Sequence, residues 1–515
     1  MNKEDSLKTI LYEQFGYTMF RSGQKEIIQD IIQGNDVLGV LPTGTGKSLC
    51  YQLPAKLLTG TTIVVSPLIS LMIDQVKQLK ASQFKSVIAL NSFIDPLERK
   101  QVYTQLDTYK LIYVSPELLQ HQELITQLKR IQVSLFVIDE AHCISQWGHE
   151  FRPDYLKLGD IIQVLNNPTI LALSATATHD VQNDIVTFLK RPNMIKHIYP
   201  MDRDNITFSI EEVSNDNEKI DVLTKLFNRY RVPALIYFSS RQSTETIAAI
   251  LKGKLSDQRI AFYHGGMEQM DRITIQQQFM NNQLDIICCT SAFGMGINKK
   301  NIRLVVHFHF PPQIESYIQE VGRAGRDGNS SVALLLYSKK DDFLPNKLIK
   351  KELPTAENLT YVFQKLLQLY KEGMLLPKTV EQLGEIFQLS EIQWRFLHYQ
   401  CEKHDIIKGN TIYYDEENWK KSFRIIQDFI EERISIKEKK LYEMIEWINE
   451  KGCLRKGLFK SFQDTVRQPS YECCSNCGFS FFNWQPENVE LNNPLGTWEE
   501  KLKTLLLIGD GNEAK

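Results

Sequence analysis

The sequence lacks any apolar run long enough to cross a membrane. Across its 515 residues, no stretch of about 18 consecutive apolar residues occurs. Residues 1–8 are polar and lack the apolar core of a secretory signal. These absences argue against a membrane-embedded or exported protein, and we expect a cytoplasmic one.

The sequence also lacks a surplus of charge of either sign, because its formal net charge is −2. This balance excludes a uniformly basic nucleic-acid-coating protein but leaves room for one local nucleic-acid groove. Its nine cysteines do not indicate disulfides in a cytoplasmic chain. Those in apolar or motif contexts are expected to be packing residues: Cys50, Cys143, Cys288, Cys289 and Cys401.

No internal repeat is present, and the length indicates three or four domains. Strand-like apolar runs alternate with helical patterns from about residue 25 to 340, which predicts parallel sheets covered by helices. The first series of strands is expected at 62–66, 111–115, 135–139 and 170–174. The second is expected at 234–239, 260–264, 285–290, 304–308 and 332–337, after a boundary near 200–217.

Beyond residue 347 helical patterns dominate. Residues 379–404 read as two helices joined by a turn, and 406–414 as a hairpin turning at Gly409 and Asn410. This order is typical of a winged helix. A plain helical hairpin followed by a ribbon stays open as the alternative.

A phosphate-binding loop is predicted at residues 41–48, which read Leu-Pro-Thr-Gly-Thr-Gly-Lys-Ser after an apolar strand at 36–40. A glycine-rich turn between a strand and a helix directs backbone N–H groups at phosphates. Lys47 would bind the β- and γ-phosphates, and Ser48 would bind Mg²⁺. The strict pattern has glycine where this chain has Leu41. The expected nucleotide-binding residues here are Thr43, Gly44, Thr45, Gly46, Lys47, Ser48 and Leu49.

Two carboxylates, Asp139 and Glu140, end the apolar run at 135–138. At the end of a buried strand, Asp139 could hold Mg²⁺ and Glu140 could polarise a water molecule. A glycine-rich turn and a solvated acidic strand end would be the structural alternative. That alternative explains neither Lys47 nor the pairing of the two motifs, which together predict nucleotide hydrolysis.

Arg323 and Arg326 lie three positions apart in a glycine-flanked segment of the second series. Arginines placed in this way can reach across a cleft to the γ-phosphate of a nucleotide held by the first series and stabilise the charge of phosphoryl transfer. A surface arginine pair on a loop is the alternative. The five residues expected to be catalytic are therefore Lys47, Asp139, Glu140, Arg323 and Arg326.

These motifs resemble those of superfamily 2 helicases, and within them the RecQ DNA helicases. The resemblance runs through residues 7–345 and returns near 430–477. It implies two RecA-like lobes, and it implies that Phe15, Arg21 and Gln24 form the segment in which the glutamine reads adenine, so that the nucleotide is ATP. It also implies that two loops, one beginning with Ser66 and Pro67 and the other at residues 115–117, face the backbone of single-stranded nucleic acid.

The most diagnostic stretch for this family is 144–155, directly after the acidic pair. It mixes aromatic rings with charge, which suits stacking on bases and contact with phosphate. Three aromatic residues in a dozen could instead be core. The direct join to the acidic pair favours a loop that couples DNA to hydrolysis. Its candidate residues are Gln146, Trp147, His149, Phe151, Arg152 and Tyr155.

A zinc site is predicted from Cys453, Cys473, Cys474 and Cys477, because Cys-x-x-Cys spacing lets two thiolates bind one Zn²⁺. In the RecQ family, which this chain resembles, the zinc region ends in a Cys-x-x-Cys-x-x-Cys run, and this chain has Ser480 in place of the last cysteine. Cys473 could replace it, although adjacent cysteines make an awkward chelate. A degenerate site held by packing is the alternative.

The winged-helix-like segment precedes the zinc region, the reverse of the common RecQ order. We expect lobe 1 at 1–205, lobe 2 at 206–346, the winged-helix-like segment at 350–420, a zinc-binding helical region at 425–485 and a tail at 486–515. The resemblance implies an ATP-dependent DNA helicase with 3′→5′ polarity that acts on single-stranded and duplex or branched DNA in repair and recombination. Its expected cofactors are ATP, Mg²⁺ and structural Zn²⁺.

We further expect a monomer that works with single-stranded-DNA-binding protein and repair factors. Two rival functions remain. An RNA helicase would share the motor motifs, although the aromatic-rich stretch and the cysteine cluster argue against it. A DNA-binding or annealing factor that uses ATP only as a switch would not need hydrolysis.

Overall fold

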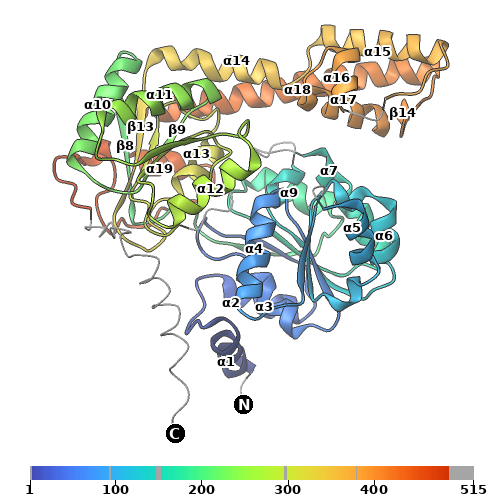
Figure 1. The fold of residues 1–515 in the computed structure, drawn as a ribbon, viewed down its shortest axis with the longest axis horizontal. Helices are drawn as coiled ribbons and strands as arrows, with labels where there is room; N and C mark the ends of the chain where they lie inside the picture. The colour runs from blue at the N-terminus through green and yellow to red at the C-terminus, as the bar shows by residue number, and fades with distance from the viewer. Residues whose placement is uncertain (1–2, 92–93, 146–151, 295–298, 378–379, 487–515) are drawn as a thin grey trace.

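The structure is a computed structural model that describes residues 3–91, 94–145, 152–294, 299–377 and 380–486. It contains two parallel sheets, each covered by helices, and a C-terminal region that is mainly helical (Figure 1). The predicted fold class is therefore confirmed. No helix in these described ranges is both long and apolar enough to cross a membrane.

The first sheet has seven parallel strands in the order β3-β4-β2-β5-β6-β1-β7. All five strands predicted in this part, including the one at 36–40, are present. The strands are β1 (Val37–Val40), β2 (Thr61–Val65), β3 (Val87–Leu90), β4 (Leu111–Val114), β5 (Val133–Ile138), β6 (Thr169–Ser174) and β7 (Ile195–Ile198).

Helices cover both faces of this sheet because its strand residues are apolar on both sides. Val64 and Val137 pack with residues of α2, α3 and α4, whereas Ile63 and Phe136 pack with residues of α5, α6, α8 and α9. The helices are α1 (Lys3–Phe15), α2 (Gln24–Ile32), α3 (Leu49–Leu57), α4 (Ile69–Ala81), α5 (Pro96–Tyr103), α6 (Gln122–Leu128), α7 (Pro153–Leu156), α8 (Leu158–Val164) and α9 (His179–Phe188).

The second sheet has six parallel strands in the order β10-β11-β9-β12-β13-β8. The strands are β8 (Ile206–Glu212), β9 (Ala234–Tyr237), β10 (Ile260–Tyr263), β11 (Ile286–Cys289), β12 (Leu304–His307) and β13 (Ser331–Tyr337). The helices are α10 (Asp216–Arg229), α11 (Arg241–Lys254), α12 (Gln269–Met280) and α13 (Ile314–Val321). Strand β8 lies inside the polar stretch at 200–217, for which the sequence predicts only a domain boundary.

The C-terminal region forms an arm that projects from the second lobe, except for its last helix, which lies against β8 (Figure 1). Its elements are α14 (Phe343–Glu352), α15 (Ala356–Lys371), α16 (Val380–Phe387), α17 (Glu391–Lys403), β14 (Ile407–Lys408), β15 (Thr411–Ile412), α18 (Glu416–Ile448) and α19 (Leu454–Phe459). Strands β14 and β15 are antiparallel, and Gly409 between them has φ +60°. The predicted helix–turn–helix and hairpin are thus present.

Helix α18 explains the unusual order of the C-terminal segments. It packs against α14, while the segment between α14 and α18 in the chain forms the far end of the arm (Figure 1). The winged-helix-like segment is therefore inserted between two packed helices. The break expected at 420–425 falls inside α18, which runs without interruption for 33 residues.

Five short 3-10 helices complete the description: η1 (Leu106–Thr108), η2 (Leu118–Gln120), η3 (Ala141–Ile144), η4 (Lys339–Asp342) and η5 (Ser475–Cys477). The five cysteines expected to be packing residues are all buried.

Candidate nucleotide-binding site

The glycine-rich loop lies between β1 and α3, as the sequence predicts. Gly44 and Gly46 adopt φ values of +83° and +77°, which residues with a Cβ rarely adopt. The Thr45 hydroxyl donates to the Pro42 carbonyl at 2.8 Å and closes the turn. The Ser48 hydroxyl makes no capping hydrogen bond to the described backbone of α3. The loop therefore presents the features of an anion site at a helix start.

The acidic pair follows β5 at the same edge of the sheet. Asp139 is only 8% exposed, and its Oδ1 accepts the Glu140 N–H at 3.0 Å. Burial, followed by the charge of Glu140, raises the pKa of Asp139 to about 7, while Lys47 acts to lower it. A buried carboxylate of this kind is a donor that suits a hard divalent cation such as Mg²⁺.

Glu140 is also connected to the next strand end. Glu140 has φ +49° and its carboxylate lies 3.5 Å from the ring of His142. His142 Nδ1 in turn lies 3.0 Å from the Ser174 hydroxyl at the end of β6. The acidic pair is thus joined by hydrogen-bonding groups to the carboxyl end of β6.

The upstream segment contacts the phosphate loop directly. The Gln24 amide donates to the carbonyls of Thr45 at 2.8 Å and Gly46 at 3.0 Å, and its oxygen accepts the Arg21 N–H at 2.9 Å. Arg21 Nη1 donates to the Gly44 carbonyl at 2.5 Å. Phe15 lies farther out, with the Lys56 ammonium 5.0 Å from its ring centroid. In this structure the glutamine expected to read adenine is bound to the phosphate loop.

The two arginines of the second lobe occupy different positions. Arg326 lies against the phosphate loop, since a Cβ placed on Gly44 would be 3.0 Å from Arg326 Cγ. Arg323 donates instead to the Gly294 carbonyl within its own lobe. The lobes also meet where the Thr43 hydroxyl donates to the Gly322 carbonyl at 2.9 Å. Arg326, rather than Arg323, is the arginine that reaches the first lobe.

The aromatic-rich stretch is partly described. Gln146, Trp147, His149 and Phe151 lie outside the described residues. The Tyr155 ring is 1% exposed, so the expectation that it offers a ring face for base stacking is wrong. Its hydroxyl donates to the Asp139 carbonyl at 3.0 Å and so joins this stretch to the acidic pair.

Arg152 connects the same stretch to the other segments expected to face nucleic acid. Its Nη1 donates to the Pro67 carbonyl at 3.3 Å and lies 3.9 Å from the Glu117 carboxylate. Next to Pro67, the Ser66 hydroxyl is buried, and no described residue forms a hydrogen bond with it. Three predicted segments that are far apart in the chain therefore meet at one place.

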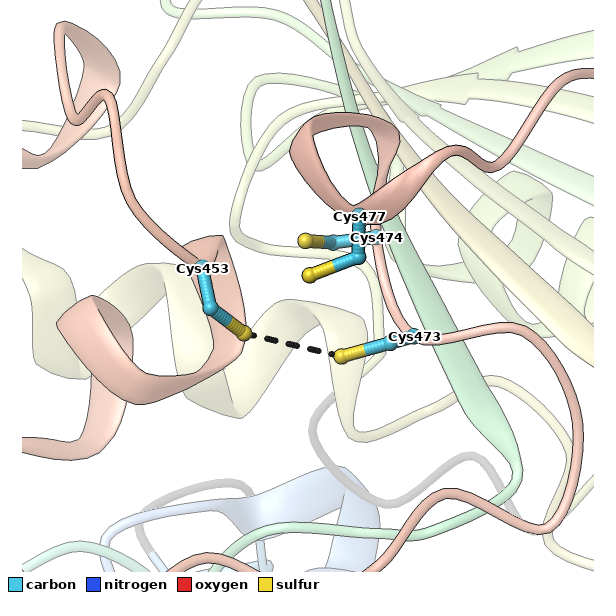
Figure 2. A group of neighbouring side chains, drawn as sticks. All are labelled: Cys453, Cys473, Cys474 and Cys477. Carbon is cyan, nitrogen blue, oxygen red and sulfur yellow. Dashed lines mark hydrogen bonds between the residues drawn. The ribbon is translucent and has the colours of Figure 1, made fainter.

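The four clustered cysteines converge. Their sulfur atoms all lie within 4.8 Å of one another, and the Sγ atoms of Cys453 and Cys473 are 3.6 Å apart (Figure 2). Two thiolates that bind one Zn²⁺ at about 2.3 Å in a tetrahedron are about 3.8 Å apart. Both adjacent cysteines, Cys473 and Cys474, therefore fit as ligands, which the spacing alone left open.

The segment carrying these cysteines extends the second sheet. The Phe208 N–H donates to the Cys473 carbonyl at 3.2 Å, and Phe208 forms a parallel bridge with Cys474 at the edge strand β8. Hydrogen bonding to this sheet edge therefore fixes the backbone of Cys473 and Cys474.

Residues 201–205 between the lobes also belong to the site, although no sequence pattern predicts it: Arg203 and Asn205 contact the loop that carries Arg323 and Arg326. The stretch carries no motif-like spacing or periodicity. Only the folded chain brings it to the site.

Comparison with known proteins identifies both lobes. Residues 21–184 match the model of the DEAD/DEAH box helicases, and residues 218–328 match the helicase conserved C-terminal domain. Solved structures with this fold include the DEAD-box helicase Mss116 bound to single-stranded RNA, with a TM-score of 0.57, 17% identity and coverage of 89% of this chain and 90% of that chain.

Curated relatives are closer in sequence. The chain is 40% identical to the probable ATP-dependent DNA helicase RecS of Bacillus subtilis, in an alignment of 507 residues that covers 98% of each chain. It is 42% identical over 352 residues to the ATP-dependent DNA helicase RecQ of Haemophilus influenzae, covering 68% of this chain and 56% of that protein. With a relative matched along nearly its whole length and both helicase domains present, the chain belongs to the RecQ-like family of ATP-dependent DNA helicases.

Proposed function

We propose that this helicase moves 3′→5′ on single-stranded DNA and unwinds duplex or branched DNA in repair and recombination. The observation that supports the motor is the contact between two loops from different lobes, whereas the polarity and the repair role are implied by the resemblance to RecQ helicases. Thr43 is bonded to Gly322, and Arg326 lies against Gly44. A γ-phosphate held by the first loop would therefore lie beside an arginine of the second, so hydrolysis and lobe movement would be linked.

On the nucleotide side, Lys47 and the N–H groups of the loop would bind the phosphates, and Gln24 would select adenine once released from its carbonyls. Ser48 and Asp139 would hold Mg²⁺, which neutralises phosphate charge when it is bound. Glu140 would orient the attacking water.

On the opposite side, Arg326 would stabilise the charge of the transferred phosphoryl group. Arg323 would support this loop through its bond to Gly294. Closing of the lobes around ATP and opening after hydrolysis would then ratchet the DNA strand.

For the zinc region, we expect one Zn²⁺ bound by Cys453, Cys473, Cys474 and Cys477. The ion would contribute folding energy rather than chemistry. For the whole protein, we expect a cytoplasmic monomer acting with single-stranded-DNA-binding protein and repair factors.

The first experiment measures strand separation with ATP and Mg²⁺ on duplexes that carry a 3′ DNA tail, a 5′ DNA tail or an RNA tail. We expect unwinding of the 3′-tailed DNA and its loss in Lys47→Ala. Unwinding only of the 5′-tailed or RNA-tailed duplex would overturn the proposed polarity or substrate. Strand annealing that survives in Lys47→Ala would favour an ATP switch over a motor.

A second experiment tests the coupling stretch. Trp147→Ala should keep basal ATP hydrolysis and lose most of its stimulation by DNA, because an aromatic base contact would be removed. Stimulation equal to that of the parent protein would refute the role of this stretch.

A further inference from the structure

The segment between the lobes touches the loop that carries Arg323 and Arg326. Arg203 lies between β7 and β8 and donates from Nη1 to the carbonyls of Ala324 at 2.8 Å and Gly322 at 3.3 Å. Its Nη2 donates to the Gly325 carbonyl. One guanidinium thus binds three carbonyls of a four-residue turn, on both sides of Arg323.

Asn205 completes this contact. Its Nδ2 donates to the carbonyls of Gly325 and Asn329, both at 2.8 Å, and its Oδ1 accepts from Arg203 Nη2 at 3.1 Å. Gly325 has φ +53°, and a Cβ at this position would overlap the Asn205 amide. The turn is therefore built for close approach of the interlobe segment.

The same turn is held from the first lobe. The Gly322 carbonyl accepts from both Arg203 and the Thr43 hydroxyl of the phosphate loop, the latter at 2.9 Å. Three parts of the molecule meet at this one carbonyl: the phosphate loop, the interlobe segment and the arginine-bearing turn. A change in the position of Arg203 would shift the turn relative to the phosphate loop.

Arg203 is placed to hold the turn rather than to bind phosphate, because its donors are directed at carbonyls. Burial lowers the pKa of Arg203 to about 10, which leaves it cationic at neutral pH. Burial, and then the charges of Arg323 and Arg203, lower the pKa of Arg326 to about 9. These like charges around the turn favour an anion at the phosphate loop.

We propose that Arg203 is a positioning residue for ATP hydrolysis, which sets the arginine-bearing turn so that Arg326 meets the γ-phosphate when the lobes are closed. The inference rests on the proposed role of Arg326. A displacement of a catalytic group by about 1 Å can cost about 100-fold in rate. Loss of the hydrogen bonds from Arg203 to the turn should therefore slow the chemical step more than it weakens ATP binding.

The test compares Arg203→Ala and Arg203→Lys with the parent protein by DNA-stimulated ATP hydrolysis, ATP binding at equilibrium and thermal melting. We expect Arg203→Ala to lower kcat roughly 10- to 100-fold while the Kd for ATP changes less than about threefold. Arg203→Lys should recover part of the rate, because a lysine ammonium can reach one carbonyl but lacks the planar guanidinium that binds several carbonyls at once. Binding of ADP with aluminium fluoride should fall with kcat.

Arg231→Ala is the matched control, since Arg231 also donates to a backbone carbonyl, that of Asp257, at an exposed position of the second lobe. It should hydrolyse ATP like the parent. A kcat for Arg203→Ala within threefold of the parent would overturn the inference. So would equal loss in Ala and Lys variants that tracks a fall in melting temperature, because that result would indicate folding alone.

Arg326→Ala separates the two proposals. If Arg326→Ala is inactive and Arg203→Ala is active, only the positioning role fails. If Arg326→Ala hydrolyses ATP at the parental rate, the proposed role of Arg326 fails, and the inference fails with it.

Discussion

Gly44 of the phosphate loop combines a positive φ with a contact to the second lobe, and Gly34 is a matched glycine that has the positive φ alone. Gly44 and Gly34 both have positive φ, +83° and +86°, but only at Gly44 would a Cβ come within 3.0 Å of Arg326 Cγ. Both Gly→Ala changes should cost about 1 kcal/mol of backbone strain. Only Gly44→Ala should also lower ATP turnover, by at least about tenfold, in steady-state assays. Equal activity of the two variants would contradict the contact between the lobes.

A buried lysine of the second lobe gives a pH-dependent prediction. Lys299 is 4% exposed, and its ammonium lies 5.0 Å from the Phe279 ring centroid. Burial lowers the pKa of Lys299 to about 8. The Asp285 carboxylate acts to raise this pKa, and Arg259 acts to lower it further. Between pH 8 and 10.5 the unfolded chain holds a proton that the folded chain lacks, so stability rises with pH.

Between pH 7.5 and 9.5, the free energy of unfolding of the parent protein should rise by on the order of 1–2 kcal/mol relative to that of Lys299→Met. In thermal melting, the melting temperature of the parent should therefore fall less over this pH range than that of the variant. Lys300→Met at the exposed neighbouring position is the control and should follow the parent. Parallel pH curves for parent and Lys299→Met would show that Lys299 does not titrate in this range.

At the scale of elements, α18 joins two hydrophobic cores. Its first half contributes Trp419, Ile426 and Ile430 to the arm, and its second half contributes Met444 and Trp447 to the core shared with the lobes. At 1.5 Å per residue its 33 residues extend about 50 Å. The helix is therefore the rigid connection between the arm and the motor.

Breaking α18 near its middle should separate unwinding from hydrolysis. Ser435 is exposed there, so Ser435→Pro removes a backbone hydrogen bond at a cost of about 3 kcal/mol without removing a core side chain. We expect basal ATP hydrolysis to be retained and duplex unwinding to fall several-fold. Ser435→Ala should match the parent in both assays. Parental unwinding by Ser435→Pro would mean that a rigid arm is not needed.

The elements also show where sequence patterns were sufficient. Strands buried on both faces, such as β5 and β6, were found because they are short continuous apolar runs. Strand β8 was missed because it lies in a polar stretch and ends in two exposed, charged residues, Glu211 and Glu212. The domain break expected at 420–425 fell inside α18 because the helix changes its packing partners without changing its helical pattern.

At the scale of the whole molecule, we propose that the chain divides into two lobes, an inserted winged-helix-like arm and a zinc-binding region. The arm also touches the first lobe, where the Lys157 ammonium lies 3.5 Å from the Glu402 carboxylate and 5.9 Å from the Tyr399 ring centroid. Because both charges of this ion pair are partly exposed, it contributes at most about 1 kcal/mol. The contact is therefore weak enough to open and close with the lobes.

Metal removal should act on the whole molecule. We expect one Zn²⁺ per chain by elemental analysis, and release of the ion by a chelator should lower the melting temperature. The cysteine segment is bonded to β8, so its loosening would expose a sheet edge and favour aggregation. Cys474→Ser should reproduce the effect, whereas Cys401→Ser, buried in the arm, should leave metal content unchanged. A metal-free protein as stable as the native one would refute the zinc site.

The sequence by itself determined the two sheets, the phosphate loop with Lys47, and the acidic pair Asp139 and Glu140. These features depend on local apolar runs and on motifs whose residues are neighbours in the chain. The tertiary structure decided that Arg326 reaches the first lobe and that Tyr155 is buried against the acidic pair. It also brought Cys473 to Cys453 and placed Arg203 behind the arginine-bearing turn. Each of these contacts joins residues that are not neighbours in the chain, so it depends on how the elements pack: within lobe 1 for Tyr155, and between the lobes for Arg326.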